Sequence, residues 1–308
     1  MKTKSVKRRH GRENLAGWLM SLPALLMLTI FVLIPFISAF IFSFYNIKLN
    51  TERPATWMGF EQYRRILFDP DLSPIFYKSL RNNFQFAVMV VPIQTGLALL
   101  LAVMLNVKLK GIAFFRIFYF MPVVFPMSLV AVIWKLIYSR DELGIANSVL
   151  KIISFGVIEP IDWLGDAKIA LISIAILSIW AGVGFQMVII LAGLQEIPAE
   201  LYEAASLDKA GKFKQFLHIT IPGLRNTLIF VVIITTIFSL RLFDQVYILT
   251  PDGGQNDSTS TVMFRAVTAA FTEGSVGTGS AYTVVFVTII IAITLLQRFF
   301  LRENREVK

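Results

Sequence analysis

Six long apolar runs divide this chain, and they constrain its fold more than any other feature of the sequence. A helix needs about 20 apolar residues to cross the ~30 Å hydrocarbon layer of a bilayer. Only helices and closed barrels satisfy their backbone hydrogen bonds in lipid, so runs of this length predict transmembrane helices. The predicted spans cover about residues 15–45, 84–107, 114–138, 169–194, 224–248 and 281–301. The sequence therefore predicts an all-α polytopic membrane protein, with a single transmembrane domain over 15–308.

Composition supports this fold class and excludes several kinds of site. Only 16% of the residues are charged and 56% are hydrophobic, whereas a soluble domain has roughly 25% charged residues. There is no cysteine, which excludes disulfides, thiolate metal sites and cysteine nucleophiles. The two histidines are His10, in a basic tail, and His218, in a polar insert. We therefore expect no catalytic residue, no metal and no cofactor on this chain.

The first apolar run follows a basic tail at residues 1–14. A secretory signal peptide has the same order of segments, but its apolar segment is only about 7–15 residues long. Because the run at 15–45 is far longer, we expect an uncleaved first span. Pro23 and Pro35 lie inside this run and predict a kink or tilt.

Lys and Arg concentrate on one side of the predicted spans. That side comprises the tail, the link at 107–116, the insert at 195–225 and the C-terminus from Arg298. In the three longer loops on the other side, basic and acidic residues nearly balance. Loops rich in Lys and Arg stay in the cytoplasm, so we expect both termini and the insert to be cytoplasmic. The net charge of +9 fits contact with anionic lipid rather than with nucleic acid.

The polar insert Leu201–Pro222 separates the fourth and fifth runs. Pro198 suits the first turn of a helix, and acidic residues in the opening turns suit its dipole. The helical spacing places Leu201, Ala204, Ala205 and Asp208 on one narrow face. We expect a break at Ala210-Gly211, followed by a second segment that turns Phe213, Phe216 and Leu217 toward the membrane-side core. On composition alone, the insert could equally be an amphipathic helix lying on the membrane surface.

The spacing within the insert resembles a family motif. Glu203-Ala204-Ala205, followed by Ile219 and Pro222, resembles the EAA motif of permease subunits of binding-protein-dependent ABC importers. Two positions depart from that motif. Lys209 stands where the family has glycine, with Gly211 two residues later, and Ile221 replaces leucine. The first departure leads us to expect that the turn is made at Ala210-Gly211.

The resemblance extends along most of the chain and narrows the family. The segments that carry it are Arg12–Trp18, Gly59–Tyr63, Asn82, Arg116–Pro126 and Leu249–Thr259, which are similar to carbohydrate uptake type 1 permeases, the first permease subunit in particular. This resemblance implies a type I importer (MetI-like) permease fold and half of a translocation pathway in a bacterial or archaeal cytoplasmic membrane. It implies four partners: a second homologous permease, an ATPase dimer that binds ATP and Mg²⁺, an extracytoplasmic solute-binding (lipo)protein and a small sugar.

In the family, the EAA segment is a coupling helix that docks on the ATPase. The resemblance implies that residues 198–218 form this helix and that Glu203 makes the charged contact. The residues it assigns to ATPase coupling are Glu203, Ala204, Ala205, Asp208, Lys209, Gly211 and Pro222. A phosphate-binding Walker A loop is missing, because Gly211-Lys212 is followed by Phe213 rather than Ser or Thr. ATP hydrolysis is therefore expected on a separate polypeptide, so this chain is not expected to be an enzyme.

Polar and aromatic side chains near the middle of the spans are candidates for the solute pathway. By depth these are Gln94, Trp180, Phe185, Gln186, Thr235, Thr236 and Ser239. The family resemblance implies the positions Val123, Met127, Ala181, Gly182, Phe185, Thr235, Ser239 and Leu242. Phe185, Gln186, Thr235, Ser239 and Leu242 form the selected set. For each hydroxyl, a hydrogen bond to its own or a neighbouring helix is an equally good explanation.

The solute remains open at this point. The family includes importers of maltose, lactose, raffinose, trehalose and glycerol-3-phosphate, so a polyol ester is an alternative to a sugar. A stand-alone secondary carrier is a further alternative, but intramembrane charges are sparse and the EAA segment would have no purpose there. A membrane-embedded enzyme is disfavoured by the lack of cysteine and of usable histidine.

Overall fold

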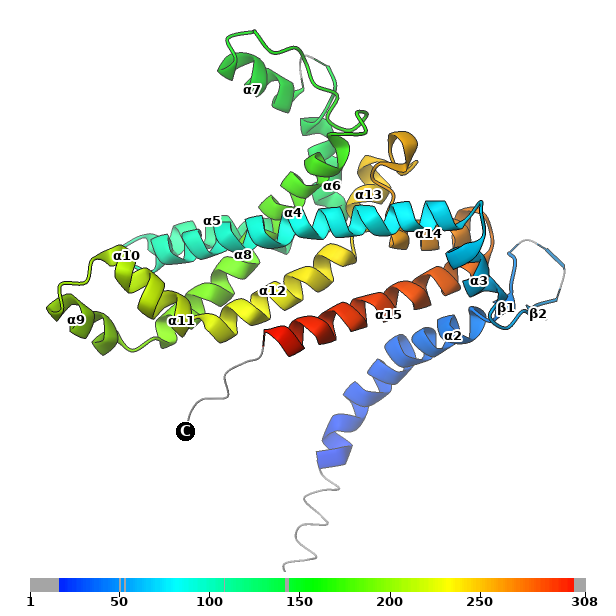
Figure 1. The fold of residues 1–308 in the computed structure, drawn as a ribbon, viewed down its shortest axis with the longest axis horizontal. Coiled ribbons are helices and arrows are strands. Elements are labelled where there is room, and N and C mark those ends of the chain that lie inside the picture. The colour runs from blue at the N-terminus through cyan, green and yellow to red at the C-terminus, as the bar shows by residue number, and fades with distance from the viewer. Residues whose placement is uncertain (1–16, 50, 53, 108, 142–143, 302–308) are drawn as a thin grey trace, which may run out of the picture. The chain divides into compact units, whose positions relative to one another are not determined.

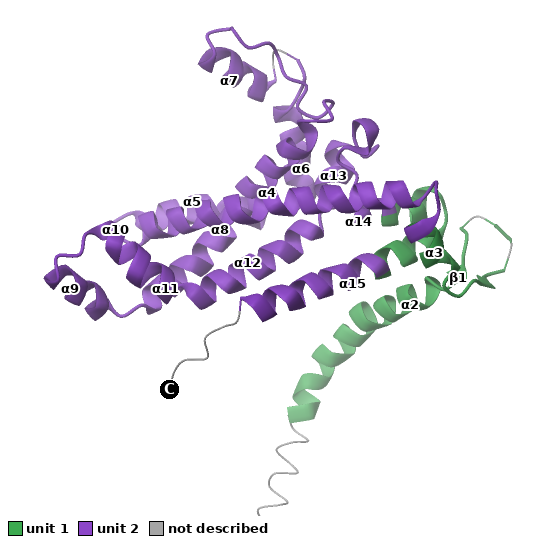
Figure 2. Ribbon diagram, in the orientation of Figure 1, with its two compact units in different colours: residues 1–66, 266–284 green, residues 67–265, 285–308 purple. Residues whose placement is uncertain are grey.

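The computed structural model describes residues 17–49, 51–52, 54–107, 109–141 and 144–301. The basic tail at 1–14 and the last residues, 302–308, lie outside the described part. The chain divides into two compact units, one of residues 1–66 and 266–284 and the other of residues 67–265 and 285–308 (Figure 2). We describe each unit by itself.

The described residues are mostly helical, as predicted (Figure 1). Five helices are long and apolar enough to cross a membrane: Gly17–Phe42, α4 (Ser73–Leu105), α8 (Ala170–Glu196), Arg225–Leu249 and α15 (Val276–Phe300). The fourth of these consists of α12 (Arg225–Leu240) and α13 (Asp244–Leu249). A sixth span is present only if the pair α5 (Ile112–Val124) and α6 (Met127–Ile137) crosses the membrane together. The helical fold is thus confirmed, while the count of six rests on this pair.

The pair α5 and α6 is bent by 98°. The apolar run at 114–138 predicted a span, and the structure divides this run into two helices. Proline disfavours helical geometry in the residue before it, and Phe125, which precedes Pro126, is extended with φ −82° and ψ 141°. Pro126 is also extended, with ψ 135°. The bend therefore lies at Pro126, the second of two prolines in this apolar segment.

The first unit contains the N-terminal helix and a small outer layer. A π-helical turn, η1 (Thr29–Leu33), leads into α2 (Ile34–Phe42), whose second residue is Pro35. The short strands β1 (Tyr45–Asn46) and β2 (Thr56–Trp57) pair antiparallel, and α3 (Glu61–Phe68) follows them. The π-turn thus directly precedes Pro35, whose nitrogen carries no N–H, and the kink or tilt of this span stays a prediction.

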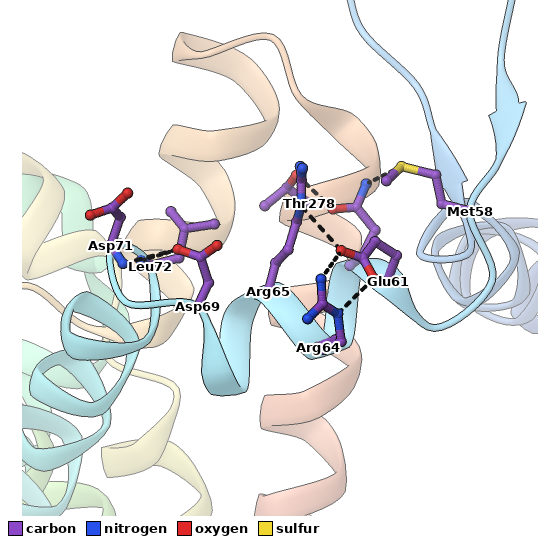
Figure 3. Close-up of polar contacts among 9 residues, drawn as sticks. Met58, Glu61, Arg64, Arg65, Asp69, Asp71, Leu72 and Thr278 are labelled. Atoms are coloured by element: carbon purple, nitrogen blue, oxygen red, sulfur yellow. Dashed lines mark hydrogen bonds and ion pairs between the residues drawn. The ribbon is translucent and has the colours of Figure 1, made fainter.

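Polar contacts at the start of α3 fix this layer. Arg64 donates two hydrogen bonds of 2.8 Å to the Glu61 carboxylate (Figure 3). This guanidinium holds the pKa of Glu61 below its usual range. The hydroxyl of Thr278, in the same unit, donates to Oε1 of Gln62 at 3.1 Å. The segment around α3 is therefore structured.

In the second unit, α4 and α8 pack closely through small residues. Ala98 and Ala102 of α4 are fully buried, in one cluster with Met187 and Ile190 of α8. On its other side, α8 approaches α5 so closely that a Cβ added to Gly184 would lie 2.1 Å from the carbonyl oxygen of Tyr119. Small residues let membrane helices approach in this way. The core of the unit is therefore built around α8, which lies between α4 and α5.

The segment after α13 is folded into the unit rather than left as a loop. Within this unit it contains η3 (Gln255–Asp257) and the first residues of α14 (Val262–Val267), whereas η4 (Thr268–Thr272) belongs to the first unit. Thr259, Ser260 and Thr261 are fully buried. Asn83 of α4 donates to the carbonyl of Leu240 at 2.8 Å and accepts from the N–H of Val262 at 3.0 Å. The turn-rich sequence after Leu249 therefore forms a bonded layer against α4.

α4 also begins well before the predicted start at residue 84. Its first turns contain polar residues that sequence reasoning assigned to a loop, including Asn82 and Asn83. Both are buried, and Asn82 donates to the carbonyls of Asp257 and Ser260 at 2.8 Å each. The helix extends because these polar side chains have partners in a distant segment.

Candidate functional site

The insert joins the end of α8 to the start of α12. It contains α9 (Ala199–Leu207), α10 (Lys212–Gln215), the π-turn η2 (Phe216–Thr220) and α11 (Ile221–Gly223). Figure 1 shows α9, α10 and α11 together at the end of this unit where α8 ends and α12 begins. Ile197 and Pro198 are extended and end α8 before α9 starts. The predicted order of a helix, a break and a second segment is therefore present.

Hydrogen bonds join α9 to the second part of the insert. The hydroxyls of Tyr202 and Thr220 lie 3.0 Å apart. The amide of Gln215 donates to the Ser206 hydroxyl and to the Ala210 carbonyl, each at 3.0 Å. Gln215 and Thr220 are buried. These contacts make α9, α10 and η2 one packed body, which is joined through Thr220 to the segment that leads into α12.

Lys209 ends α9 in a left-handed conformation, with φ +58°. The N–H of Lys209 bonds to the Ser206 carbonyl at 3.0 Å, and the N–H of Ala210 to the Ala205 carbonyl at 2.9 Å. These two bonds define a Schellman motif with Lys209 at the position that glycine prefers. Gly211 has φ −66° and ψ 162°, which any residue adopts. The expectation that the turn is made at Ala210-Gly211 was therefore wrong, because Lys209 makes it.

The outer face of the insert combines charge with exposed apolar groups. Glu203, Ala204 and Asp208 are exposed, and Ala205 is half-buried. Leu207, one helical turn after Glu203 on the same side of α9, is 85% exposed. Phe213 is 73% exposed, which corrects our prediction that it faces the membrane-side core. A carboxylate beside exposed apolar side chains is suited to binding a protein rather than water alone.

Two of the predicted pathway residues contact each other. The amide of Gln186 on α8 donates to the hydroxyl of Thr235 on α12 at 2.6 Å, and that hydroxyl donates to the Val231 carbonyl at 2.6 Å. Gln186 and Thr235 are 1% and 3% exposed. The carbonyl oxygen of the Gln186 side chain is buried without a partner among the described residues. The structure thus places an interhelical hydrogen bond where we predicted contact with solute.

The other selected pathway residues are Phe185 on α8, Ser239 on α12 and Leu242, which follows the end of α12. Ser239 and Leu242 are buried, whereas Phe185 is half-buried. Their assignment to the solute pathway stays a prediction.

Sequence reasoning missed a second polar contact, made by the last span. The amide of Gln297 on α15 donates to the Thr236 hydroxyl at 3.0 Å, and Thr236 donates to the Val232 carbonyl at 2.8 Å. The Gln94 amide of α4 lies against Gly182, where an added Cβ would be 2.5 Å from its nitrogen. A glutamine within an apolar span, as at 297, was the signal that could have identified this contact.

Among the residues that the structure describes, no group of three or more His, Cys, Asp and Glu side chains is placed to hold a metal ion.

Comparison with known proteins gives consistent results. The family model "Binding-protein-dependent transport system inner membrane component" matches residues 94–306. The probable ABC transporter permease protein YurN of Bacillus subtilis is 35% identical over 96% of this chain and 99% of that protein. The trehalose/maltose transport system permease protein MalF of Thermococcus litoralis is 32% identical over 92% of this chain and 93% of that protein.

The fold has a counterpart among solved structures. A chain of a bacterial ABC transporter involved in the import of the acidic polysaccharide alginate superposes with a TM-score of 0.81 and 19% identity. The match covers 98% of this chain and 100% of that chain. At this level of identity the match establishes a shared fold.

Proposed function

The chain belongs to the binding-protein-dependent transport system inner membrane components, and from this premise we propose that it is one permease subunit of an ATP-driven sugar importer. The resemblance stated from the EAA segment is thereby confirmed at the level of the family. Permeases of this family move a solute and leave ATP hydrolysis to a separate subunit, so the chain is not an enzyme. Sugar as the solute is supported by relatives named for sugar transport, such as the trehalose/maltose permease.

The insert between α8 and α12 is the observation that carries the proposal. Its exposed face presents Glu203 and Leu207 on α9, and hydrogen bonds connect α9 to the segment that enters α12. An ATPase that binds this face and moves it would move the ends of both α8 and α12. In this proposal the coupling residues are Glu203, Ala204, Ala205, Asp208, Lys209, Gly211 and Pro222.

The contact between α8 and α12 supports transmission of that movement. A Cβ added to Gly193 of α8 would lie 2.6 Å from the hydroxyl oxygen of Thr227 on α12. Farther from the insert, Gln186 and Thr235 join the same two helices. With a close contact near the insert and a hydrogen bond deeper in the span, α8 and α12 would move as one body. Phe185, Gln186, Thr235, Ser239 and Leu242 lie on or next to this body and are proposed to shape the solute pathway.

The proposed assembly contains this permease, a second homologous permease, an ATPase dimer and an extracytoplasmic solute-binding protein. The insert and the outer layer around α14 lie at opposite ends of α12, so the two sets of partners would meet the chain on opposite sides of the membrane. We place the assembly in a bacterial or archaeal cytoplasmic membrane, with both termini and the insert in the cytoplasm. That orientation is supported by the excess of Lys and Arg on the insert side.

Co-purification tests the assembly directly. The chain is produced with its candidate ATPase and second permease, extracted in mild detergent and reconstituted in lipid with the solute-binding protein. We expect all subunits to purify together and ATP hydrolysis to rise when the loaded binding protein is added. A stand-alone carrier would purify alone and transport without ATP, which would refute the proposal. A thermal-shift panel of sugars and glycerol phosphates on the binding protein then separates a sugar from a polyol ester.

A further inference from the structure

The helix α7 (Ile145–Ile153) lies between α6 and α8, at the opposite end of α8 from the insert. Because α8 is long enough to cross a membrane, α7 and the insert belong to opposite membrane faces. Figure 2 shows α7 beyond the end of α6, away from the other labelled helices of its unit. This short helix plays no part in the coupling described above.

A helix on the surface of a water-soluble protein buries apolar side chains and exposes polar ones, and α7 does the reverse. Its one fully buried residue among those described is Asn147, which is 2% exposed. The Asn147 side chain accepts from the N–H of Ile161 at 3.0 Å and from the indole N–H of Trp163 at 2.9 Å. It also donates to the Ile161 carbonyl at 3.1 Å. The polar side of α7 therefore faces its own loop.

The apolar side of α7 faces outward. Ile145, Val149, Ile152 and Ile153 follow the spacing of one helical face, and they are 58%, 49%, 74% and 71% exposed. The chain after the helix extends this surface. We call the whole set, Ile145, Val149, Ile152, Ile153, Phe155, Val157 and Ile158, the α7 patch. Burying Asn147 while exposing these side chains is favourable only if the surroundings of the patch are apolar.

Phe155 is the most exposed member of the patch, at 94%. It has φ +53°, and its N–H bonds to the Ile152 carbonyl at 3.2 Å while the N–H of Gly156 bonds to the Lys151 carbonyl at 2.8 Å. Phe155 thus occupies the glycine-preferring position of a Schellman motif. A bulky residue in this conformation is strained, and such strain persists at functional positions. In water, Phe155 would be strained and exposed with no compensating contact; in an apolar medium its ring would be buried.

The preceding helix, α6, also has an exposed apolar face. Leu129, Val132, Ile133 and Leu136 also follow one helical face and are 46%, 50%, 49% and 70% exposed. The opposite side of α6 packs into the core through Val130 and Ala131. Since α6 belongs to the apolar bent pair, lipid is the expected environment of its outward face. The α7 patch follows this face along the chain, on a helix that lies beyond the end of α6 (Figure 2).

The chemistry of the patch fits lipid better than a protein partner. Helix contacts inside this chain use small residues such as Ala98, Ala102 and Gly184, as membrane helix interfaces generally do. The patch contains only large aliphatic side chains and one phenylalanine. A dissociable contact with a soluble protein would be more polar and richer in Tyr, Trp and Arg. Branched aliphatic and phenylalanine side chains on one face are typical of a helix lying in the membrane interface.

From these observations we propose that α7 is an interfacial membrane anchor, with Phe155 inserted among the acyl chains of the leaflet opposite the coupling insert. The anchor holds the far end of the bent pair α5–α6 at a fixed depth. The proposal depends on the chain being a membrane protein but not on its solute or on the coupling role of Glu203. Its failure would therefore leave the proposed function untouched.

The natural absence of cysteine allows a direct test. Ile152→Cys, Phe155→Cys and the control Glu159→Cys, which replaces an exposed acidic residue of the same loop, each receive a nitroxide spin label. The assembled importer, with the cysteines of its partner subunits blocked beforehand, is reconstituted in bilayers. Relaxation of each label by oxygen, which concentrates in lipid, is compared with relaxation by a water-soluble nickel chelate. Only variants that assemble and hydrolyse ATP as the parent complex does are measured.

We expect strong oxygen and weak nickel relaxation at 152 and 155, and the reverse at 159. Nickel relaxation at 152 and 155 as strong as at 159 would overturn the proposal, because the patch would then face water. Weak relaxation by both reagents would also overturn it, because the patch would then be covered by protein. Weak relaxation without the solute-binding protein would indicate contact with the second permease. Weak relaxation that appeared only after the solute-binding protein was added would indicate contact with that protein. Should the cysteine variants fail to assemble, Phe155→Trp retains a ring. Because the chain has 5 native tryptophans, quenching by brominated lipids is measured on the variant and the parent complex, and the difference between them gives the same decision.

Discussion

The side-chain amide of Gln186 donates a 2.6 Å hydrogen bond to the hydroxyl of Thr235, which joins α8 to α12 within their apolar segments. Both residues are almost completely buried. They lie on the two helices that hold the coupling insert. The bond therefore connects the two arms through which any movement of the insert would pass.

Removing this bond is expected to loosen the two helices from each other. Hydrogen bonds between membrane helices contribute about 0.6 kcal/mol on average and up to about 1.7 kcal/mol in double-mutant cycles. We expect Gln186→Leu and Thr235→Val to show a coupling energy in that range, measured from the stability of the purified complex. We also expect ATP hydrolysis that depends less on the loaded binding protein.

Thr294→Val is a matched control for this cycle. The Thr294 hydroxyl donates to the Ile290 carbonyl of its own helix at 2.8 Å. We expect this change to leave the dependence on the binding protein intact. Strictly additive effects of Gln186→Leu and Thr235→Val would contradict the role of this bond.

Lys209 is held in a left-handed conformation at the end of α9, so replacing it with glycine is expected to be stabilising. The left-handed region costs an ordinary residue roughly 1–2 kcal/mol, and glycine avoids this cost. Glycine also gives the unfolded chain more conformational entropy, which offsets about 0.5–1 kcal/mol of the gain. Lys209→Gly should therefore raise the unfolding midpoint slightly. Lys209→Val should lower it, because a branched side chain tolerates this conformation poorly.

Gly211→Ala is the control that shows whether the turn depends on the positive φ of Lys209 or on the glycine two residues later. Gly211 has ordinary backbone angles, and an added Cβ would meet nothing within 4 Å. We expect no loss of stability from Gly211→Ala. A clear loss there, with no change from Lys209→Gly, would show that the turn depends on Gly211 after all.

Asn83 bridges two backbone groups from distant parts of the chain, the Leu240 carbonyl and the Val262 N–H. A buried backbone group left without a partner costs about 1–3 kcal/mol. Asn83→Leu leaves two such groups and should destabilise the complex by about 2–4 kcal/mol, seen as a lower unfolding midpoint. Asn106→Ala, at an exposed helix end, should change it little; equal effects of the two substitutions would argue against the bridge.

These contacts show which parts of the molecule could be read from the sequence. The apolar runs predicted the positions of the long helices because the requirement to cross a bilayer is a local property of each run. The break in the run at 114–138 is also local, since Pro126 restricts Phe125. The size of the bend between the two helices depends on their packing and is not contained in the local pattern.

The remaining features depend on residues far apart in the sequence. The early start of α4 follows from the bonds of Asn82 and Asn83 to residues beyond 239, which no local pattern contains. The same holds for Gln186, which was selected as a solute contact and is bonded to Thr235. The end of α9 was misplaced for another reason. Glycine was taken to mark the turn, and Lys209 has the positive φ instead.

The last prediction concerns Glu203, an exposed carboxylate on the outward side of α9. If it contacts the ATPase, Glu203→Arg replaces an attraction with a repulsion at that interface. Losing one partner of a charged pair at an interface costs about 2–5 kcal/mol, so we expect ATPase association to weaken on the order of 100-fold. Because Glu203 has an exposed side chain, membrane insertion and the fold of the permease should be retained.

Glu196→Arg makes the same change of charge at the last residue of α8, which is also exposed. A basic residue suits the end of a helix, so this variant should assemble and transport as the parent does. Uptake into proteoliposomes and co-purification of the ATPase are measured for both variants at equal expression. Normal transport by the Glu203→Arg variant would remove Glu203 from the coupling contact. Loss of transport with the ATPase still bound would instead place its role after docking, in the movement passed from α9 to α8 and α12.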